Sequence, residues 1–177
     1  DINLHNSWMD FSPDYNTWRN LVPENLMTEY VGFDSGDWRA SSLRVKNKYG
    51  QSNVFLDYVG YRIFDGRLPL GDLPSADADE NTQTLEISLI DNLTNLSVKL
   101  YYTVFPDSDV ISRYAVYENN GESALTIEKS MSLTVDLDNC DFDMISFYGN
   151  WDNERNFERY HIRHGLQSVY SRRGMSS

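Results

Sequence analysis

Residues 82–104 decide the fold class, and they read Thr-Gln-Thr-Leu-Glu-Ile-Ser-Leu-Ile-Asp-Asn-Leu-Thr-Asn-Leu-Ser-Val-Lys-Leu-Tyr-Tyr-Thr-Val. Apolar residues recur at every second position on both sides of the break at residues 91–95. They are Leu85, Ile87 and Leu89 before the break, and Leu96, Val98, Leu100, Tyr102 and Val104 after it. A period of two places these side chains on one face of an extended chain. The stretch therefore predicts two strands, each with one buried face, joined by a turn.

Working outward, the same pattern predicts two further strand pairs. Asn119-Asn120-Gly121 suits a tight turn, because Asn and Gly tolerate positive φ. We therefore expect a hairpin between residues 110–118 and 123–137, with the apolar positions from Leu125 to Leu137 on one face of its second strand. Residues 43–48 and 53–64 are expected to pair around the turn at 49–52.

Helix signals are scarce. Only residues 23–27 suggest a single helical turn, with a proline at its first position. The chain has 177 residues, of which 40% are hydrophobic, and this is enough to bury one core. The sequence predicts one all-β domain over residues 1–177, built as a large antiparallel β-sandwich of two stacked sheets.

Composition limits the kinds of partner that the protein can bind and indicates the compartment in which it works. The formal net charge of -12 disfavours binding to nucleic acid or to anionic membrane surfaces. Cys140 is the single cysteine, so no intrachain disulfide can form and a reducing compartment is favoured. The chain opens on Asp1 rather than Met and stops at Ser177, which suggests a piece of a longer protein.

Several carboxylates and histidines could carry catalysis, and each also has an ordinary structural role. Hydrolysis of glycosides needs two carboxylates facing each other. Asp107 with Asp109, and Asp141 with Asp143, stand in turn-like contexts, where Asp is favoured because it bonds the local backbone. His161 and His164 lie three apart on an expected strand, which places them on opposite faces. With His5, they fit no metal-ligand spacing. Motifs for phosphate loops, dinucleotides and serine nucleophiles are absent, so no metal and no cofactor is predicted.

Charged residues near the carboxyl end allow two interpretations. They are Glu154, Arg155, Glu158 and Arg159, followed by Arg172 and Arg173. On an extended strand these side chains can form cross-strand ion pairs. The arginines can instead clamp the carboxylates of a neighbouring domain, because a guanidinium binds a carboxylate through two parallel hydrogen bonds.

Aromatic residues are abundant, with four tryptophans and twelve tyrosines. Core packing is their common use, although an aromatic face can also stack on a sugar ring. Trp18 is the exception, because it lies beside Arg19 in a non-periodic segment expected to be a loop, and loops often carry function.

Three stretches resemble the amino-terminal domain of glycoside hydrolase family 36, which contains bacterial α-galactosidases and raffinose-degrading enzymes. They are residues 149–177, with Trp151 and the charged residues above, residues 104–113, and Glu29-Tyr30 leading to residues 36–39. The resemblance implies a β-supersandwich of the galactose mutarotase type. It also implies a catalytic (β/α)8 barrel after residue 177, which hydrolyses terminal α-1,6-galactosides such as melibiose and raffinose with retention.

The resemblance also implies where function lies. The two catalytic aspartates of the family belong to the barrel, one of them within Lys-Trp-Asp. That motif is absent here, so no catalytic residue is expected in this chain. In tetrameric members a loop before the Glu-Tyr pair supplies an Arg to the sugar site of a neighbouring subunit, and by spacing this is Arg19, beside Trp18. The region from Trp151 to Arg173 is expected to dock on the barrel, and the enzyme to reside in the bacterial cytoplasm.

Two other classes of protein remain open from the residues alone. One is a free carbohydrate-binding module with an aromatic platform, and the other is the equivalent sandwich domain of another glycoside hydrolase or a phosphorylase.

Overall fold

A computed structural model of the chain describes residues 29–35, 39–71, 75–135, 137 and 141–170. The chain forms two compact units, Asp1–Val135 and Asp136–Ser177. The prediction of one domain over the whole length stays a prediction. No helix in the described ranges is long and apolar enough to cross a membrane.

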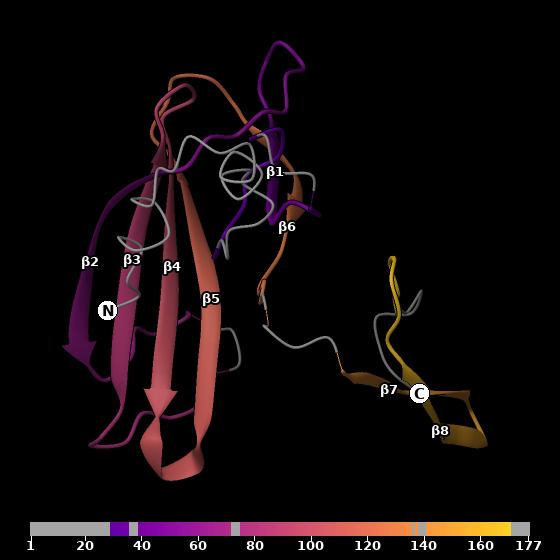
Figure 1. Cartoon of the computed structure of the whole chain (residues 1–177). Helices are drawn as coiled ribbons and strands as arrows, with labels where there is room; N and C mark the ends of the chain where they lie inside the picture. Colours follow the sequence, from indigo (N-terminus) through magenta and orange to yellow (C-terminus); the bar gives the residue numbers. More distant parts are fainter. Residues whose placement is uncertain (1–28, 36–38, 72–74, 136, 138–140, 171–177) are drawn as a thin grey trace, which may run out of the picture. The chain divides into compact units, whose positions relative to one another are not determined.

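The first unit contains a four-stranded antiparallel sheet in the order β2-β3-β4-β5 (Figure 1). Its strands are β2 (Asp57–Asp65), β3 (Gln83–Asp91), β4 (Leu96–Phe105) and β5 (Val110–Asn119). The turn predicted at 91–95 joins β3 to β4, and this pair runs in register from Asp91–Leu96 to Gln83–Val104. A short 3-10 helix, η2 (Pro106–Ser108), joins β4 to β5 and ends at Asp109, whose φ of 50° is left-handed.

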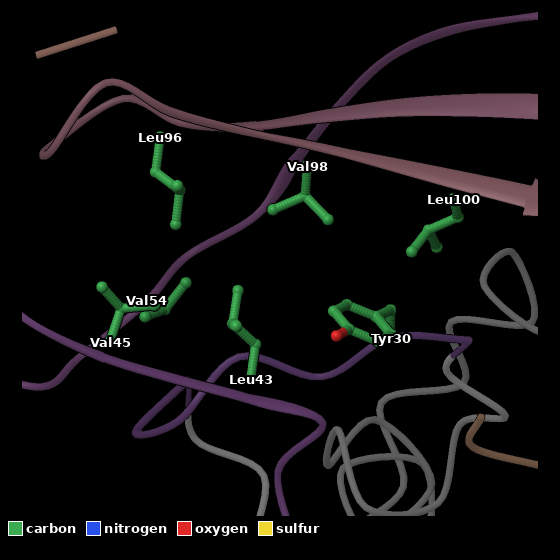
Figure 2. Packing of buried hydrophobic residues seen from close by; sticks show 7 residues of the cluster. All are labelled: Tyr30, Leu43, Val45, Val54, Leu96, Val98 and Leu100. Carbon is green, nitrogen blue, oxygen red and sulfur yellow. The ribbon is translucent and has the colours of Figure 1, made fainter. Parts of the chain in front are cut away.

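A second layer covers part of this sheet. Strand β1 (Leu43–Lys46) pairs antiparallel with β6 (Thr126–Ser130). Figure 2 shows the apolar side chains of β4 facing those of β1 and its neighbours. The core consists of Tyr30, Leu43, Val45, Val54, Leu96, Val98 and Leu100. The alternating residues of β4 that the sequence placed on one face thus form one wall of the core.

Two predicted strand pairings are wrong. Residues 110–118 pair with β4 instead of residues 123–137, and the second strand of the expected hairpin shortens to β6, which pairs with β1. Residues 43–48 and 53–64 do not pair with each other, because β2 joins β3. Alternation indicates which residues share a face, but it does not identify the neighbouring strand. Here the turn at Gly121 leads the chain out of the sheet and into the covering layer.

The second unit is a hairpin of β7 (Asp143–Asn150) and β8 (Asn153–His161). Its register shifts between Tyr148 and Asn150, next to the turn. The all-β, antiparallel architecture predicted from the sequence is confirmed, and the described residues contain no α-helix. The helical turn expected at 23–27 lies outside the described residues.

Candidate functional sites: the hairpin and the Arg113 cluster

The predicted site residues fall into two groups. Trp18, Arg19, Arg172 and Arg173 lie outside the described residues. The others lie in one short element, the turn and second strand of the β7–β8 hairpin. They are Trp151, Glu154, Arg155, Glu158 and Arg159.

Trp151 stands at the tip of this hairpin, in the turn between β7 and β8, and is 88% exposed. Core packing, the common use of tryptophan, is therefore wrong for this residue. Arg155 has a left-handed φ of 57°, close to the register shift. Such an irregularity bends a strand locally and redirects the side chains on either side of it.

One face of the hairpin carries three exposed apolar side chains, Ile145, Phe147 and Phe157. Phe147 and Phe157 face each other across the strands with their ring centroids 5.8 Å apart in a T-shaped contact. Ile145 lies on the same face, opposite Arg159. Phe147 is 53% and Phe157 59% exposed. These side chains form an exposed apolar patch on the surface of the hairpin.

Arg159 forms a cross-strand ion pair, which is the first of the two interpretations of the charged residues. Its Nε donates to Oδ2 of Asp143 at 2.6 Å, and Nδ1 of His161 lies 3.3 Å from Oδ1 of the same carboxylate. The hydrogen bond from Arg159, and then that with His161, lowers the pKa of Asp143 below its usual range. No ion pair involves Glu154, Arg155 or Glu158 in the part of the chain that the structure describes.

The turn interpretation of the acidic pairs holds for one of them. Asp107 lies in η2 and Asp109 follows it, as expected for turn residues. For Asp143 the interpretation is wrong, because this residue opens β7. His164 lies in a bend after β8, and only His161 is on the strand. Among the described residues, no three His, Cys, Asp or Glu side chains are grouped to hold a metal ion.

A second site was not predicted as a unit. We call it the Arg113 cluster, and it consists of Glu29, Tyr30, Tyr102, Arg113 and Tyr117. It brings together two of the stretches that carry the family resemblance, Glu29-Tyr30 and residues 104–113. The sequence signal was an arginine in the otherwise apolar face of β5, because a buried charge requires partners.

The guanidinium of Arg113 is the centre of this cluster, and its side chain is only 5% exposed. Its Cζ lies 5.1 Å from the ring centroid of Tyr102 and 5.5 Å from that of Tyr30. Nη1 donates to the carbonyl oxygen of Ser132 at 3.0 Å. Nη2 lies 3.0 Å from Oε1 of Glu29, close enough for an ion pair, although its N–H direction makes no hydrogen bond.

The tyrosine hydroxyls complete the cluster. Tyr102 donates to Oε1 of Glu29, and Tyr30 donates to the carbonyl oxygen of Met131 at 3.2 Å. Tyr30 also shares a short hydrogen bond with Tyr117. Burial, and then these hydrogen bonds, raise the pKa values of Tyr30 and Tyr102 well above the usual range, so both phenols remain neutral. The cluster therefore connects Glu29 and Tyr30 to side chains of β4 and β5.

The fold defines a class of protein, an antiparallel β-sandwich domain. Residues 5–177 match the family model described as the glycosyl hydrolase family 36 N-terminal domain. The chain belongs to this family.

Similar proteins agree with this membership. The chain is 39% identical to the bifunctional alpha-galactosidase/sucrose kinase AgaSK of Mediterraneibacter gnavus, over 90% of this chain and 17% of that protein. It is 35% identical to the alpha-galactosidase AgaA of Geobacillus stearothermophilus, over 90% of this chain and 22% of that protein. The crystal structure of AgaA superposes with a TM-score of 0.84 at 34% identity, over 93% of this chain and 23% of that chain. The chain thus spans about a fifth of the length of these relatives.

Proposed function

We propose that this chain is the non-catalytic amino-terminal domain of a cytoplasmic bacterial α-galactosidase whose (β/α)8 barrel follows residue 177. The observation that carries the proposal is the family match over residues 5–177, together with relatives that are named alpha-galactosidases. The barrel supplies both catalytic carboxylates of a retaining glycosidase, which must stand about 5 Å apart across the scissile bond.

The proposed substrates are terminal α-1,6-galactosides such as melibiose and raffinose. Solved structures of AgaA variants that are similar to this chain are described as complexes with raffinose and with stachyose. In the proposed tetramer, Arg19 and Trp18 contact the sugar bound by a neighbouring subunit. A guanidinium suits sugar hydroxyls because its hydrogen bonds are charge-assisted.

The hairpin is the proposed docking surface for the barrel. Its open face carries Phe147 and Phe157, and Trp151 projects from its tip. An isolated two-stranded hairpin is marginally stable in water, so a covering surface stabilises it. The exposed guanidinium of Arg155, with Arg172 and Arg173, is proposed to bind carboxylates of the barrel.

The direct test of the proposal uses the purified chain and the longer enzyme side by side on nitrophenyl α-galactoside. We expect turnover by the longer enzyme and none by the chain above a preparation from cells with the empty vector. Turnover by the chain that persists through further purification contradicts the non-catalytic role.

The contact across subunits has its own test, in which Arg19→Ala is made in the longer enzyme. We expect KM for raffinose to rise while the unfolding temperature of the tetramer stays close to that of the unmodified enzyme, because most surface substitutions change stability by less than about 0.5 kcal/mol. If kcat/KM stays within about threefold, Arg19 has no part in binding sugar.

One observation favours a second candidate, a free carbohydrate-binding module, because Trp151 is 88% exposed and suits stacking on a pyranose. Titration of the chain with raffinose, followed by tryptophan fluorescence, tests this function. Saturable binding that Trp151→Ala abolishes supports the module, and no response supports docking instead.

A further inference from the structure

The four-stranded sheet is longer than the two strands that cover it. β4 and β5 have ten residues each, whereas β1 has four and β6 has five. At about 3.3 Å per residue, β4 spans about 33 Å and β1 about 13 Å. Figure 1 shows β1 and β6 beside the upper part of the sheet, with the lower part extending beyond them. These two strands therefore face only one end of the inner face, which is the sheet face that carries Leu96, Val98 and Leu100.

Exposure rises along one row of side chains on this inner face. Leu100 of β4, Ile87 of β3 and Tyr61 of β2 lie opposite one another, so they share a face. Leu100 is 1% exposed, Ile87 is partly buried, and Tyr61 is 65% exposed. The core thus stops before it reaches β2.

Two neighbouring pairs extend the exposed apolar region toward the lower end of the sheet. Ile63 lies opposite Leu85, and Val104 lies opposite Ile111. Leu85 is opposite Tyr102, two residues before Val104 on the same face, so the pairs adjoin. Ile63 is 62%, Val104 43% and Ile111 67% exposed. We call the following residues the inner-face patch: Tyr61, Ile63, Leu85, Ile87, Val104 and Ile111.

Acidic residues border the inner-face patch at its lower end. Asp65 ends β2 and, through Gln83, lies in the same row as Val104. Asp107 and Asp109 lie in the connection from β4 to β5, and all three aspartates are exposed. A second copy of the chain would bring the same carboxylates and a net charge of -12, and like charges placed together disfavour binding. The border therefore favours a partner with an apolar centre and a basic edge.

We propose that the inner-face patch is covered by a further β-layer of the same subunit, contributed by the part of the longer protein after residue 177. This layer presents aliphatic or aromatic side chains to the patch and a lysine or arginine to its acidic border. The inference rests on the proposed function in one respect, that this chain is the first part of a longer enzyme. It uses no residue of the hairpin, so the contact is additional to the proposed docking of the hairpin on the barrel.

Continuity with the core supports this occupant. The inner-face patch and the core lie on one face of the same strands, and Leu100 and Tyr61 belong to one row. Sandwich domains bury such a face under a second sheet about 10 Å away. A layer that continues beyond β1 and β6 would extend the existing core and leave the four-stranded sheet unchanged. The chain spans about a fifth of the length of its relatives, which have enough residues to supply such a layer.

The test measures the reactivity of one thiol on each face of the sheet, in the chain and in the longer enzyme. Ile63→Cys places the thiol on the inner-face patch. The matched control is Val116→Cys on the opposite face, where Val116 lies opposite Lys99 and is 42% exposed. Both variants also carry Cys140→Ser, and mass spectrometry of peptides identifies the modified cysteine.

We expect N-ethylmaleimide to modify the Ile63→Cys variant at least about tenfold more slowly in the longer enzyme than in the chain, because a covered thiol reacts only through local opening. The Val116→Cys variant should react at similar rates in both proteins. Equal rates for the Ile63→Cys variant in the two proteins overturn the inference.

Other occupants give other results, and each of them also overturns the inference. Slow reaction of the Ile63→Cys variant in the chain by itself assigns the cover to a segment of this chain, or to a second copy if the rate falls as the concentration rises. Protection that disappears when the longer enzyme dissociates into subunits assigns the cover to a neighbouring subunit. Turnover of nitrophenyl α-galactoside is measured on the same samples. Protection without turnover contradicts the proposed function alone, and turnover without protection contradicts this inference alone.

Lysine substitutions provide a second test if the thiol variants assemble poorly. Ile63→Lys and Val116→Lys should shift the urea midpoint of the chain by similar amounts, because both side chains are exposed there. In the longer enzyme Ile63→Lys should lower the midpoint more than Val116→Lys, because a charge buried in an apolar contact is costly. Equal shifts in the longer enzyme contradict the inference.

Discussion

The sheet unit and the hairpin unit both carry apolar side chains on a strand face, yet only the sheet unit buries part of that face under a second layer. Leu43 of β1 and Val98 of β4 are 0% exposed, because two layers meet between them. Phe147 and Phe157 of the hairpin form an equally regular cross-strand pair and remain more than half exposed. The difference teaches that alternation creates an apolar face, and a second layer turns this face into a core.

This difference assigns separate roles to the two units. The sheet unit has the buried apolar area that stabilises a fold, at roughly 25 cal/mol per Å² removed from water. The hairpin carries an exposed apolar pair, Phe147 and Phe157, to which the proposed function assigns a contact with the barrel. Changes in the first unit should therefore affect folding, and changes in the second should affect assembly.

The largest expected effect is on the free energy of unfolding. It is seen when one apolar side chain in each unit is truncated and the two variants are compared. Leu43→Ala should destabilise the chain by about 2–5 kcal/mol, because it removes a fully buried side chain and leaves a cavity. Phe157→Ala should change the unfolding of the sheet unit by less than about 0.5 kcal/mol. Urea unfolding of both variants measures the difference. Equal destabilisation would show that the two units share one core.

A smaller loss of stability is expected when a glycine of the sheet unit is replaced by alanine at a crowded position. A Cβ at Gly32 would lie 2.1 Å from the carbonyl oxygen of Val54, whereas a Cβ at Gly60 meets nothing within 4 Å. Gly32→Ala should therefore cost about 1–3 kcal/mol, because the backbone of Val54 has to move. Gly60→Ala, the control, should be close to neutral. Thermal unfolding of the two variants tests the packing of the covering layer, and equal midpoints would contradict it.

The sequence predicted which face of a strand is buried better than it predicted which strands pair. The alternation at Leu96, Val98 and Leu100 identified the core wall of β4, because side-chain direction follows from the local backbone. It misassigned the partner of residues 126–130, because pairing depends on where a loop carries the chain after Gly121. No local pattern encodes that path, and an apolar strand suits either neighbour.

For the candidate sites, too, the sequence located residues but did not predict their contacts. The charged run 154–159 was located, but its use was undecided between ion pairs and a clamp, because that depends on the cross-strand neighbour Asp143. The sequence did not predict the Arg113 cluster, although Glu29-Tyr30 and residues 104–113 both belong to the stretches that carry the family resemblance. The contact between them depends on the tertiary fold, and the one local signal that could have suggested it is an arginine in an apolar strand face.

The next expected effect is a pH dependence of the hairpin. Arg159 and His161 lower the pKa of Asp143, so the carboxylate stabilises the hairpin above the usual aspartate pKa. This contribution is lost as the pH falls from about 4 downward. A carboxyl titration by NMR should give Asp143 a midpoint below the usual value, and Arg159→Gln should move it back up. A normal midpoint in the unmodified chain would contradict the ion pair.

Amide hydrogen exchange, measured on the chain and on the longer enzyme, tests most directly whether the sheet unit is self-sufficient and the hairpin depends on a partner. In the chain, amides of β3 and β4 should exchange only through global unfolding, because their strands are buried in the sheet, whereas amides of β7 and β8 should exchange much faster. In the longer enzyme the hairpin amides should become as protected as those of the sheet. Equal protection of both units in the chain by itself, or an unprotected hairpin in the longer enzyme, would contradict the account.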